Sequence, residues 1–159
     1  MLQKLLPDEL QKHKLELSTY LNESFGNDTR IDYGTGHEMN FVIFLHCLFK
    51  IEFLSRETDL ESVGLCVFHR YMQLARALQK RFRMEPAGSQ GVWALDDYQF
   101  VPFIWGAAQF IRDGHVEPKS IPDHELAQKL SPDYHFFGCI QYIYEVKSGP
   151  FAEHSNQVL

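Results

Sequence analysis

The densest group of side chains able to do chemistry lies in the sequence RIDYGTGHE, which begins at residue 30. Thr35 precedes Glu38 by three positions, the spacing of a capping box, in which hydroxyl and carboxylate each bond the other residue's backbone N–H. The sequence therefore predicts that a helix begins here. Because helix N-termini offer free N–H groups and a partial positive charge, the loop before it can hold an anion or a carbonyl oxygen. That loop carries Asp32, Tyr33 and His37.

Two sharper interpretations of this stretch are excluded by its spacing. The residue four positions after His37 is Phe41, so the pair His37-Glu38 does not begin a zincin motif. Gly34 and Gly36 are followed neither by a third glycine in Rossmann spacing nor by the Gly-Lys-Ser/Thr of a P-loop. A tight turn followed by an N-cap is the simpler alternative.

The second unusual stretch, MEPAGSQGVWALDD, covers residues 84–97. It has the composition of a loop, yet it contains Trp93 and two adjacent carboxylates. Either Asp96 or Asp97 can cap the next helix, since aspartate is a preferred N-cap residue. The other is then a candidate to hold a substrate amide or a metal ion.

A third stretch, GPFAEHSN, covers residues 149–156. Here an acid and a histidine follow Gly-Pro-Phe, a composition that resembles neither a linker nor a disordered tail. Lys147 lies just before it, and either neutralises a bound phosphate or complements the negative end of a helix.

Composition narrows the class of protein. The chain has 159 residues, of which 45% are hydrophobic, and it carries a formal net charge of −6. Acidity argues against nucleic-acid binding, which normally requires a basic patch. Thirteen Phe, seven Tyr and two Trp indicate a heavily packed interior or a groove lined with aromatic side chains.

The three cysteines and the apolar stretches place further limits. Cys47, Cys66 and Cys139 are odd in number and lack CxxC spacing, which predicts reduced thiols. The first residues lack the apolar run of a signal peptide. Residues 39–54 are too short and too often interrupted by polar residues to span a membrane, so we expect a buried helix and no membrane contact.

Hydrophobic periodicity predicts an all-α fold with five or six helices in a single domain over residues 1–159. The expected helices cover residues 7–25, 35–54, 58–83, 97–112, 123–130 and 131–147. Thr58 and Glu61 form a second capping box. The long third helix shows a core-facing stripe made of Val63, Val67, Tyr71, Leu74 and Leu78. The last helix has five residues predicted to face inward, Phe136, Cys139, Ile140, Ile143 and Tyr144.

Taken together and in this order, the loops resemble the phosphotyrosyl phosphatase activator (PTPA) family, the activators of serine/threonine protein phosphatase 2A. The resemblance rests on YLNESFGN, RIDYGTGHE, RMEPAGS, GVW, LDDYQF, PFIWG and GPFAEHSN, which begin at residues 20, 30, 83, 91, 95, 102 and 149. These motifs cover most of the chain, and their combination is highly specific.

The resemblance implies a helical fold of core, linker and lid parts with a deep cleft between core and lid. It also implies binding to the scaffold and catalytic subunits of the phosphatase, chaperone-like help in loading metal into its active site, and a location in cytoplasm and nucleus. Family members are considerably longer. We therefore expect a domain that is incomplete at both ends and exposes apolar surface, which favours a homodimer or aggregation.

The resemblance further implies peptidyl-prolyl cis/trans isomerase activity on a proline-containing peptide. Amide rotation needs no nucleophile, and its barrier of roughly 18–20 kcal/mol falls when the amide loses planarity in a dry pocket. Trp93, Tyr33 and Phe151 are candidates to seat the proline ring. A donor to the twisted amide nitrogen is expected from His37 or Tyr33. The candidate catalytic residues are Asp32, Tyr33, His37 and Trp93.

ATP with Mg²⁺ is the cofactor that the resemblance implies. Gly34-Thr35-Gly36 and the helix N-terminus would hold phosphate oxygens. The carboxylates expected to hold Mg²⁺ are Asp32, Glu38, Asp96 and Asp97, since this ion prefers oxygen ligands. The residues predicted to bind substrate or nucleotide are Gly34, Thr35, Gly36, Glu38, Gly91, Asp96, Asp97, Lys147, Gly149, Pro150, Phe151 and His154.

Three functional hypotheses follow. The chain acts as a chaperone-like activator whose isomerase activity is incidental, or as an isomerase whose catalysis is the activating event. The alternative to both is a non-catalytic phosphatase-binding module or an inactive fragment. All depend on the convergence of the segments around Tyr33, Trp93 and Phe151 into one crevice.

Overall fold

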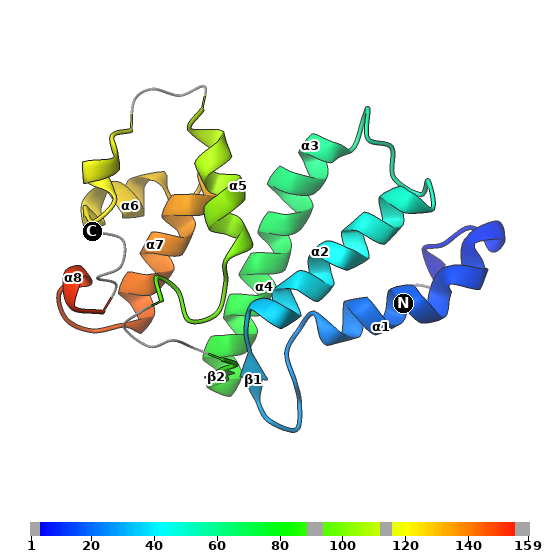
Figure 1. Cartoon of the computed structure of the whole chain (residues 1–159), viewed down its shortest axis with the longest axis horizontal. Helices are drawn as coiled ribbons and strands as arrows, with labels where there is room; N and C mark the ends of the chain where they lie inside the picture. Colours follow the sequence, from blue (N-terminus) through cyan, green and yellow to red (C-terminus); the bar gives the residue numbers. More distant parts are fainter. Residues whose placement is uncertain (1–3, 89–93, 112–115, 155–159) are drawn as a thin grey trace. The chain divides into compact units, whose positions relative to one another are not determined.

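The computed structural model describes residues 4–88, 94–111 and 116–154, and almost all of its regular structure is helical (Figure 1). The all-α prediction is therefore confirmed, with one short pair of strands added. The chain divides into two compact units, Met1–Ala87 and Gly88–Leu159. Each unit is described by itself, and the single domain predicted over residues 1–159 stays a prediction. None of the helices formed by the described residues has the length and apolar character needed to cross a membrane.

The first unit begins with two consecutive helices rather than the single one predicted. A 3₁₀ helix, η2, covers Asp8–His13, and the α-helix α1 covers Lys14–Glu23. The helix begins at Asp8, one position later than predicted, and Pro7 is its N-cap. The Pro7 carbonyl accepts a bond from the Leu10 N–H at 3.0 Å. This i→i+3 bond closes the tighter 3₁₀ turn, which is common at the start of a helix.

The central helix α2 covers Thr35–Lys50, and it is capped differently from the prediction. Gly34 is the N-cap, Thr35 is already helical, and no side chain caps the helix, so the predicted capping box is wrong. A Cβ at Gly34 would lie 2.5 Å from the carbonyl oxygen of Ala87. Only glycine therefore allows the two backbone segments to approach this closely.

The long third helix contains a π-helical segment that sequence periodicity did not reveal. Helix α3 covers Leu60–Ser62, the π segment η3 covers Val63–Val67, and α4 continues over Phe68–Phe82. Asp59 precedes the first turn and no side chain caps it, so the capping box at Thr58 and Glu61 is also wrong. A π segment adds one residue to the helical count, and it therefore rotates every later residue relative to an unbroken α-helix.

This rotation changes which face of α4 is buried. Val63 and Tyr71 are buried as predicted, whereas Val67, Leu74 and Leu78 are replaced in the core by the residue that follows each of them. The buried residues of α4 are Phe68, Tyr71, Met72, Ala75 and Gln79. Much of the predicted apolar stripe consequently faces away from the core, with Leu74 48% exposed.

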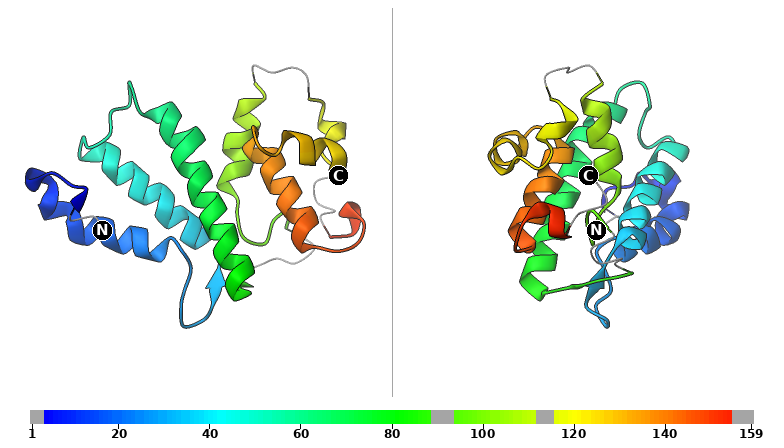
Figure 2. Two further views of the ribbon diagram at one scale, coloured as in Figure 1. Left: turned by 180° about the vertical axis from the view of Figure 1, so that it is seen from behind. Right: turned by 60° about the vertical axis from the view of Figure 1, so that its left-hand side comes forward.

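Two short strands close the first unit (Figure 2). β1 covers Asp32–Tyr33 and pairs in parallel with β2, Glu85–Pro86. The Glu85 N–H donates to the Ile31 carbonyl, and the Ala87 N–H donates to the Tyr33 carbonyl, both at 2.8 Å. This pairing brings the RIDYGTGHE loop against the start of the second unusual stretch, since Asp32 pairs with Glu85, 53 residues later.

Residues 94–111 and 116–154 of the second unit form five short helices around an apolar core. They are α5 Val101–Gln109, η5 Pro118–Ser120, α6 His124–Leu130, α7 His135–Val146 and α8 Phe151–His154. The buried core is made of Phe103, Ala127, Phe137, Cys139, Ile140, Ile143 and Phe151. Cys139, Ile140 and Ile143 face inward as predicted, while Phe136 and Tyr144 are partly buried at the edge of this core.

The helix boundaries of the second unit correct two predictions. α5 begins at Val101 rather than at residue 97, because the chain around Asp96 forms a separate turn. α7 begins at His135 rather than after Ser131-Pro132, because Ser131 is the C-cap of α6. α6 agrees with the prediction, and the carboxylate of its N-cap Asp123 accepts a bond from the Leu126 N–H at 3.0 Å.

Candidate functional site

The loop between α1 and β1 is folded by the side chain of Asn27. Its Oδ1 accepts bonds from the backbone N–H groups of Thr29 and Arg30, at 3.0 and 2.8 Å. Its own backbone N–H donates to the carbonyl of Asp32 at 2.9 Å. An asparagine that bonds the backbone two and three residues onward holds a turn in place. Asn27 thus fixes the path that presents Arg30 and Asp32 together.

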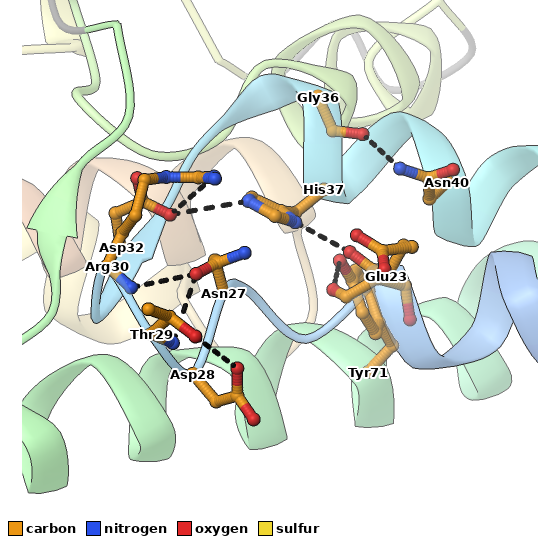
Figure 3. Close-up of polar contacts among 11 residues, drawn as sticks. Glu23, Asn27, Asp28, Thr29, Arg30, Asp32, Gly36, His37, Asn40 and Tyr71 are labelled. Atoms are coloured by element: carbon orange, nitrogen blue, oxygen red, sulfur yellow. Dashed lines mark hydrogen bonds and ion pairs between the residues drawn. The ribbon is translucent and has the colours of Figure 1, made fainter.

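Asp32 is held by a two-pronged contact with Arg30 (Figure 3). Arg30 Nε lies 2.6 Å from Asp32 Oδ2, and Arg30 Nη2 lies 3.1 Å from Asp32 Oδ1. The hydrogen bond from Arg30 is the main reason that the pKa of Asp32 lies below its ordinary value. Asp32 is therefore a carboxylate at neutral pH, and much of its hydrogen-bonding capacity is occupied by a planar guanidinium.

His37 lies between Asp32 and the end of α1, as Figure 3 shows. Its Nδ1 is 2.6 Å from the Glu23 carbonyl oxygen, and its Nε2 is 3.6 Å from Asp32 Oδ1. Since a carbonyl only accepts, Nδ1 carries the proton in this bond. In the neutral ring Nε2 is then an acceptor, and only the protonated ring donates toward Asp32. We refer to Arg30, Asp32 and His37 as the Asp32 cluster.

Tyr33 faces the interior. It is 0% exposed, and its hydroxyl is 2.6 Å from that of Tyr71. The Tyr71 hydroxyl donates to the Ser24 carbonyl at 2.8 Å, so the proton between the two hydroxyls comes from Tyr33. Burial raises the pKa of Tyr71 above its ordinary value. The structure thus gives Tyr33 a structural part in a chain of buried hydrogen bonds, and its predicted contact with substrate stays a prediction.

The start of α2 is open at Thr35 and Gly36, both of which are exposed. A Cβ added at Gly36 would meet no heavy atom within 4 Å. Glu38, by contrast, is fully buried, and its charge contributes to the raised pKa of Tyr71. The helix N-terminus is therefore accessible to a ligand at Thr35 and Gly36, whereas the carboxylate of Glu38 faces the interior.

In the second unit, the two adjacent carboxylates have different partners. Asp96 Oδ1 accepts bonds from the backbone N–H groups of Tyr98 and Gln99, at 2.7 and 3.1 Å. Asp97 Oδ2 lies 3.1 Å from Lys147 Nζ, and both side chains are largely shielded from solvent. The prediction that one of the pair caps the next helix is wrong, because Asp96 holds a turn before α5, whose N-cap is Phe100. Asp97 pairs with Lys147, and its contact with a substrate stays a prediction.

The residues predicted around 149–154 also differ in their surroundings. Phe151 is buried in the core of the second unit, with its ring centroid 5.4 Å from that of Tyr144. Gly149 and Pro150 are exposed, and Gly149 has φ +98°, a conformation that favours glycine. His154 ends α8, and its side chain is outside the described part of the structure.

Comparison with known proteins decides the family. A family model described as phosphotyrosyl phosphate activator (PTPA) protein matches residues 1–159. The chain belongs to this family.

Individual relatives and a solved structure agree with the PTPA assignment. The chain is 52% identical to the serine/threonine-protein phosphatase 2A activator of Drosophila melanogaster over 158 residues, which are 99% of this chain and 39% of that protein. It is 47% identical to the probable serine/threonine-protein phosphatase 2A activator 1 of Dictyostelium discoideum, over 97% of this chain and 47% of that protein. The crystal structure of the PP2A phosphatase activator Ypa1 superposes with a TM-score of 0.89 at 32% identity, over 99% of this chain and 50% of that one. The chain thus spans about half or less of the length of these relatives.

Within each unit, the carboxylates predicted for Mg²⁺ in this PTPA chain have other partners or are buried. Asp32 is paired with Arg30 and Asp97 with Lys147, while Asp96 accepts two backbone bonds. Glu38 is buried. Within residues 4–88, 94–111 and 116–154, no three His, Cys, Asp or Glu side chains are grouped so that they could hold a metal ion. These donors therefore do not fit Mg²⁺ as arranged.

Two predicted site residues, Gly91 and Trp93, lie outside the described residues. The convergence of the segments around Tyr33, Trp93 and Phe151 stays a prediction. Sequence reasoning missed the contribution of Asn27 to the Asp32 cluster. Its position in a Gly-Asn-Asp turn was the available signal, since asparagine commonly bonds the backbone two residues ahead.

Proposed function

We propose that this chain binds serine/threonine protein phosphatase 2A and takes part in its activation, in contact with the scaffold and catalytic subunits. The observation that carries the proposal is the match to the PTPA family over the whole chain, supported by relatives that are named phosphatase 2A activators. The surface nominated for this contact is the Asp32 cluster. Its Arg30 side chain is 61% exposed, while the side chains of Asp32 and His37 behind it are 14% and 11% exposed.

The cluster suits a chaperone-like part in loading metal into the phosphatase. The two hydrogen bonds from Arg30 hold Asp32 in place before a partner arrives, so little side-chain entropy is lost on binding. Such a prearranged charged patch contributes more to partner choice and association rate than to raw affinity. It would recognise a complementary charged surface beside the active site of the phosphatase.

The direct test is reactivation of a metal-depleted scaffold–catalytic dimer by the 159-residue chain. We expect binding and reactivation by the unchanged chain, and a loss of about tenfold or more with Asp32→Ala, because Arg30 and His37 then lose their partner. Glu57→Ala is the matched control, since it removes an exposed carboxylate that bonds only Ser55 in the described structure. Failure of the unchanged chain to bind the dimer would reject the proposal.

Peptidyl-prolyl isomerase activity is the second function proposed. The geometry of the site favours His37 over Tyr33 as the donor to the amide nitrogen. The Tyr33 hydroxyl donates to Tyr71 in the interior. His37 can donate from Nε2 only when its ring carries both protons, because Nδ1 already donates to the Glu23 carbonyl. A donor to the twisted amide nitrogen would then come from His37.

The two activities are separated by assaying the same variants in both reactions. Asp32→Ala, Trp93→Ala and Gly149→Asp are each measured for phosphatase reactivation and for isomerisation of a proline-containing peptide. Parallel losses support one shared mechanism. Reactivation that survives without isomerisation would leave a chaperone-like activator or a non-catalytic binding module.

Nucleotide binding is proposed at the open N-terminus of α2, where Thr35 and Gly36 are exposed. Backbone N–H groups and the helix dipole favour phosphate oxygens there. Titration calorimetry with ATP, with and without Mg²⁺, tests this proposal, and Gly36→Asp should abolish any heat of binding through charge repulsion. A cytoplasmic and nuclear location is also proposed, and fluorescent tagging of the chain in cells would test it.

A further inference from the structure

A pocket lies within the first unit, next to the loop that carries the Asp32 cluster. It is bounded by the end of α1, by residues 25–31 and by the end of α4, and its volume is about 510 Å³. Its apolar lining is made of Phe25, Ile31, Leu78, Phe82 and Met84. We call it the Met84 pocket. Its size falls within the range of about 300–1,000 Å³ that is typical of ligand sites.

Two walls of the Met84 pocket face solvent. Phe82 is 60% exposed and Ile31 is 48% exposed, although both are large apolar side chains. Ile31 has φ +53°, which a β-branched residue rarely adopts. The bond from the Glu85 N–H to its carbonyl helps to keep it there. Since strained backbone persists only where its surroundings enforce it, the fold holds Ile31 at the mouth of the pocket.

The polar part of the lining is acidic. Glu23 and Asp28 contribute carboxylates, Asn22 and Asn27 contribute amides, and none of the lining residues is Lys or Arg. Both carboxylates belong to exposed residues. The pocket therefore combines an apolar interior with negative charge at its edge. A neutral apolar ligand would use only the first of these features, whereas an apolar side chain with basic neighbours would use both.

We propose that the Met84 pocket is a docking site for a segment of a partner protein that inserts an apolar side chain flanked by Lys or Arg. Solvent-facing apolar walls that surround a concave centre, with charge at the rim, are typical of the anchor pockets of protein interfaces. The proposal does not depend on phosphatase activation, because none of Arg30, Asp32 and His37 lines the pocket.

The test uses a library of random dodecapeptides displayed on phage and selected on the 159-residue chain. We expect the enriched peptides to share an apolar residue beside Lys or Arg. Phe82→Ser should weaken their binding by about tenfold or more, since it removes an anchor wall. Glu23→Gln combined with Asp28→Asn should weaken binding several-fold and reduce its dependence on salt. Leu15→Ser is the matched control, because it removes an exposed apolar side chain of α1 that does not line the pocket.

Several results would overturn this inference. They are the absence of enrichment, enrichment of peptides without basic residues, and equal binding to the Phe82→Ser chain. A dimer seen by analytical ultracentrifugation and lost in Phe82→Ser would instead assign the pocket to a second copy of this chain. If circular dichroism shows that Phe82→Ser is unfolded, the double change at Glu23 and Asp28 provides the same comparison. Phosphatase reactivation is also measured on these variants, so that failure of the docking proposal can be told apart from failure of the proposed function.

Discussion

At the scale of single residues, the hydrogen bonds of the first unit assign a donor and an acceptor to most groups near Asp32. Nδ1 of His37 must carry a proton because it faces the Glu23 carbonyl, and Tyr33 must donate because Tyr71 already donates to Ser24. These assignments need only the rule that carbonyl oxygens accept. They show that Tyr33 and His37, four residues apart and both buried, have different partners.

Arg30→Ala should raise the pKa of Asp32 toward its ordinary value. The hydrogen bond from Arg30 is the main cause of the lowered pKa, so its loss removes most of the shift. A carboxyl whose pKa is lowered on folding stabilises the native state above the unfolded pKa of about 3.9, and this contribution is lost as pH falls through the folded value. NMR titration of the side-chain carboxyl carbon measures the change. Arg70→Ala, whose guanidinium bonds Gln73, should leave the titration of Asp32 unaltered.

Tyr71→Phe should destabilise the chain more than Tyr33→Phe. Removing the Tyr71 hydroxyl leaves both the buried Tyr33 hydroxyl and the Ser24 carbonyl without that partner, at a cost of about 1–3 kcal/mol. Tyr33→Phe removes one donor and leaves the bond from Tyr71 to Ser24, so a cost of about 0.5–1.5 kcal/mol is expected. Urea unfolding followed by circular dichroism gives both values. The reverse order would contradict the assigned direction of the hydrogen bonds.

At the scale of helices and strands, close backbone approach and helical register decide what packs. α5 and α7 approach so closely at Gly106 that a Cβ there would lie 2.3 Å from the backbone nitrogen of Phe136. The π segment Val63–Val67 shifts the register of α4 by one residue and so determines its buried face. The close approach depends on the single residue Gly106, and the register shift depends on one extra residue in the π segment.

Gly106→Ala should lower the free energy of unfolding by about 1–3 kcal/mol, as expected for overpacking against backbone that cannot move aside. The gain in helix propensity from Gly to Ala, about 1 kcal/mol at most, does not offset the clash. Gly64→Ala is the matched control, because a Cβ there meets nothing within 4 Å. Equal stability of the two variants in thermal unfolding would argue against the close contact of α5 and α7.

Deleting Leu65 should be tolerated better than deleting Arg76. A deletion inside the π segment removes the extra residue and leaves the faces on either side in register, whereas a deletion within α4 rotates one half against the other. Thermal unfolding of the two deletion variants measures the difference. A larger loss for the Leu65 deletion would show that the bulge itself is required.

At the scale of the whole molecule, the chain divides into two compact units. The Tyr33–Tyr71 chain lies in the unit Met1–Ala87, and the contact at Gly106 lies in the unit Gly88–Leu159. Residues that share no partner contribute independently to stability. The units are also small, and the fraction of surface that a chain buries falls with its size.

The effects of Tyr71→Phe and Gly106→Ala should therefore add within about 0.5 kcal/mol in the double variant, as for independent sites. Differential scanning calorimetry of the four chains tests this expectation. A coupling free energy well above that limit would show that the two units stabilise each other.

The sequence by itself determined the all-α class, the central helix, α6, three of the five inward residues predicted for α7 and the family, because periodicity and loop motifs are local properties of the chain. It also identified Asp32, His37 and the pair Asp96-Asp97 as candidate site residues, whose partners only the structure shows. It did not determine the caps of the first unit, where Gly34 rather than Thr35 precedes α2 and Asp59 rather than Thr58 precedes α3.

Tertiary structure alone decided the remaining features. The parallel pairing of β1 with β2 joins segments that are far apart in the chain, and no local pattern records it. The π segment moved the buried face from Val67, Leu74 and Leu78 to their neighbours, because one extra residue in a helical turn rotates all that follow. The partners of Tyr33 likewise became apparent only in space, since a hydroxyl's role is set by the donors and acceptors that the fold brings to it.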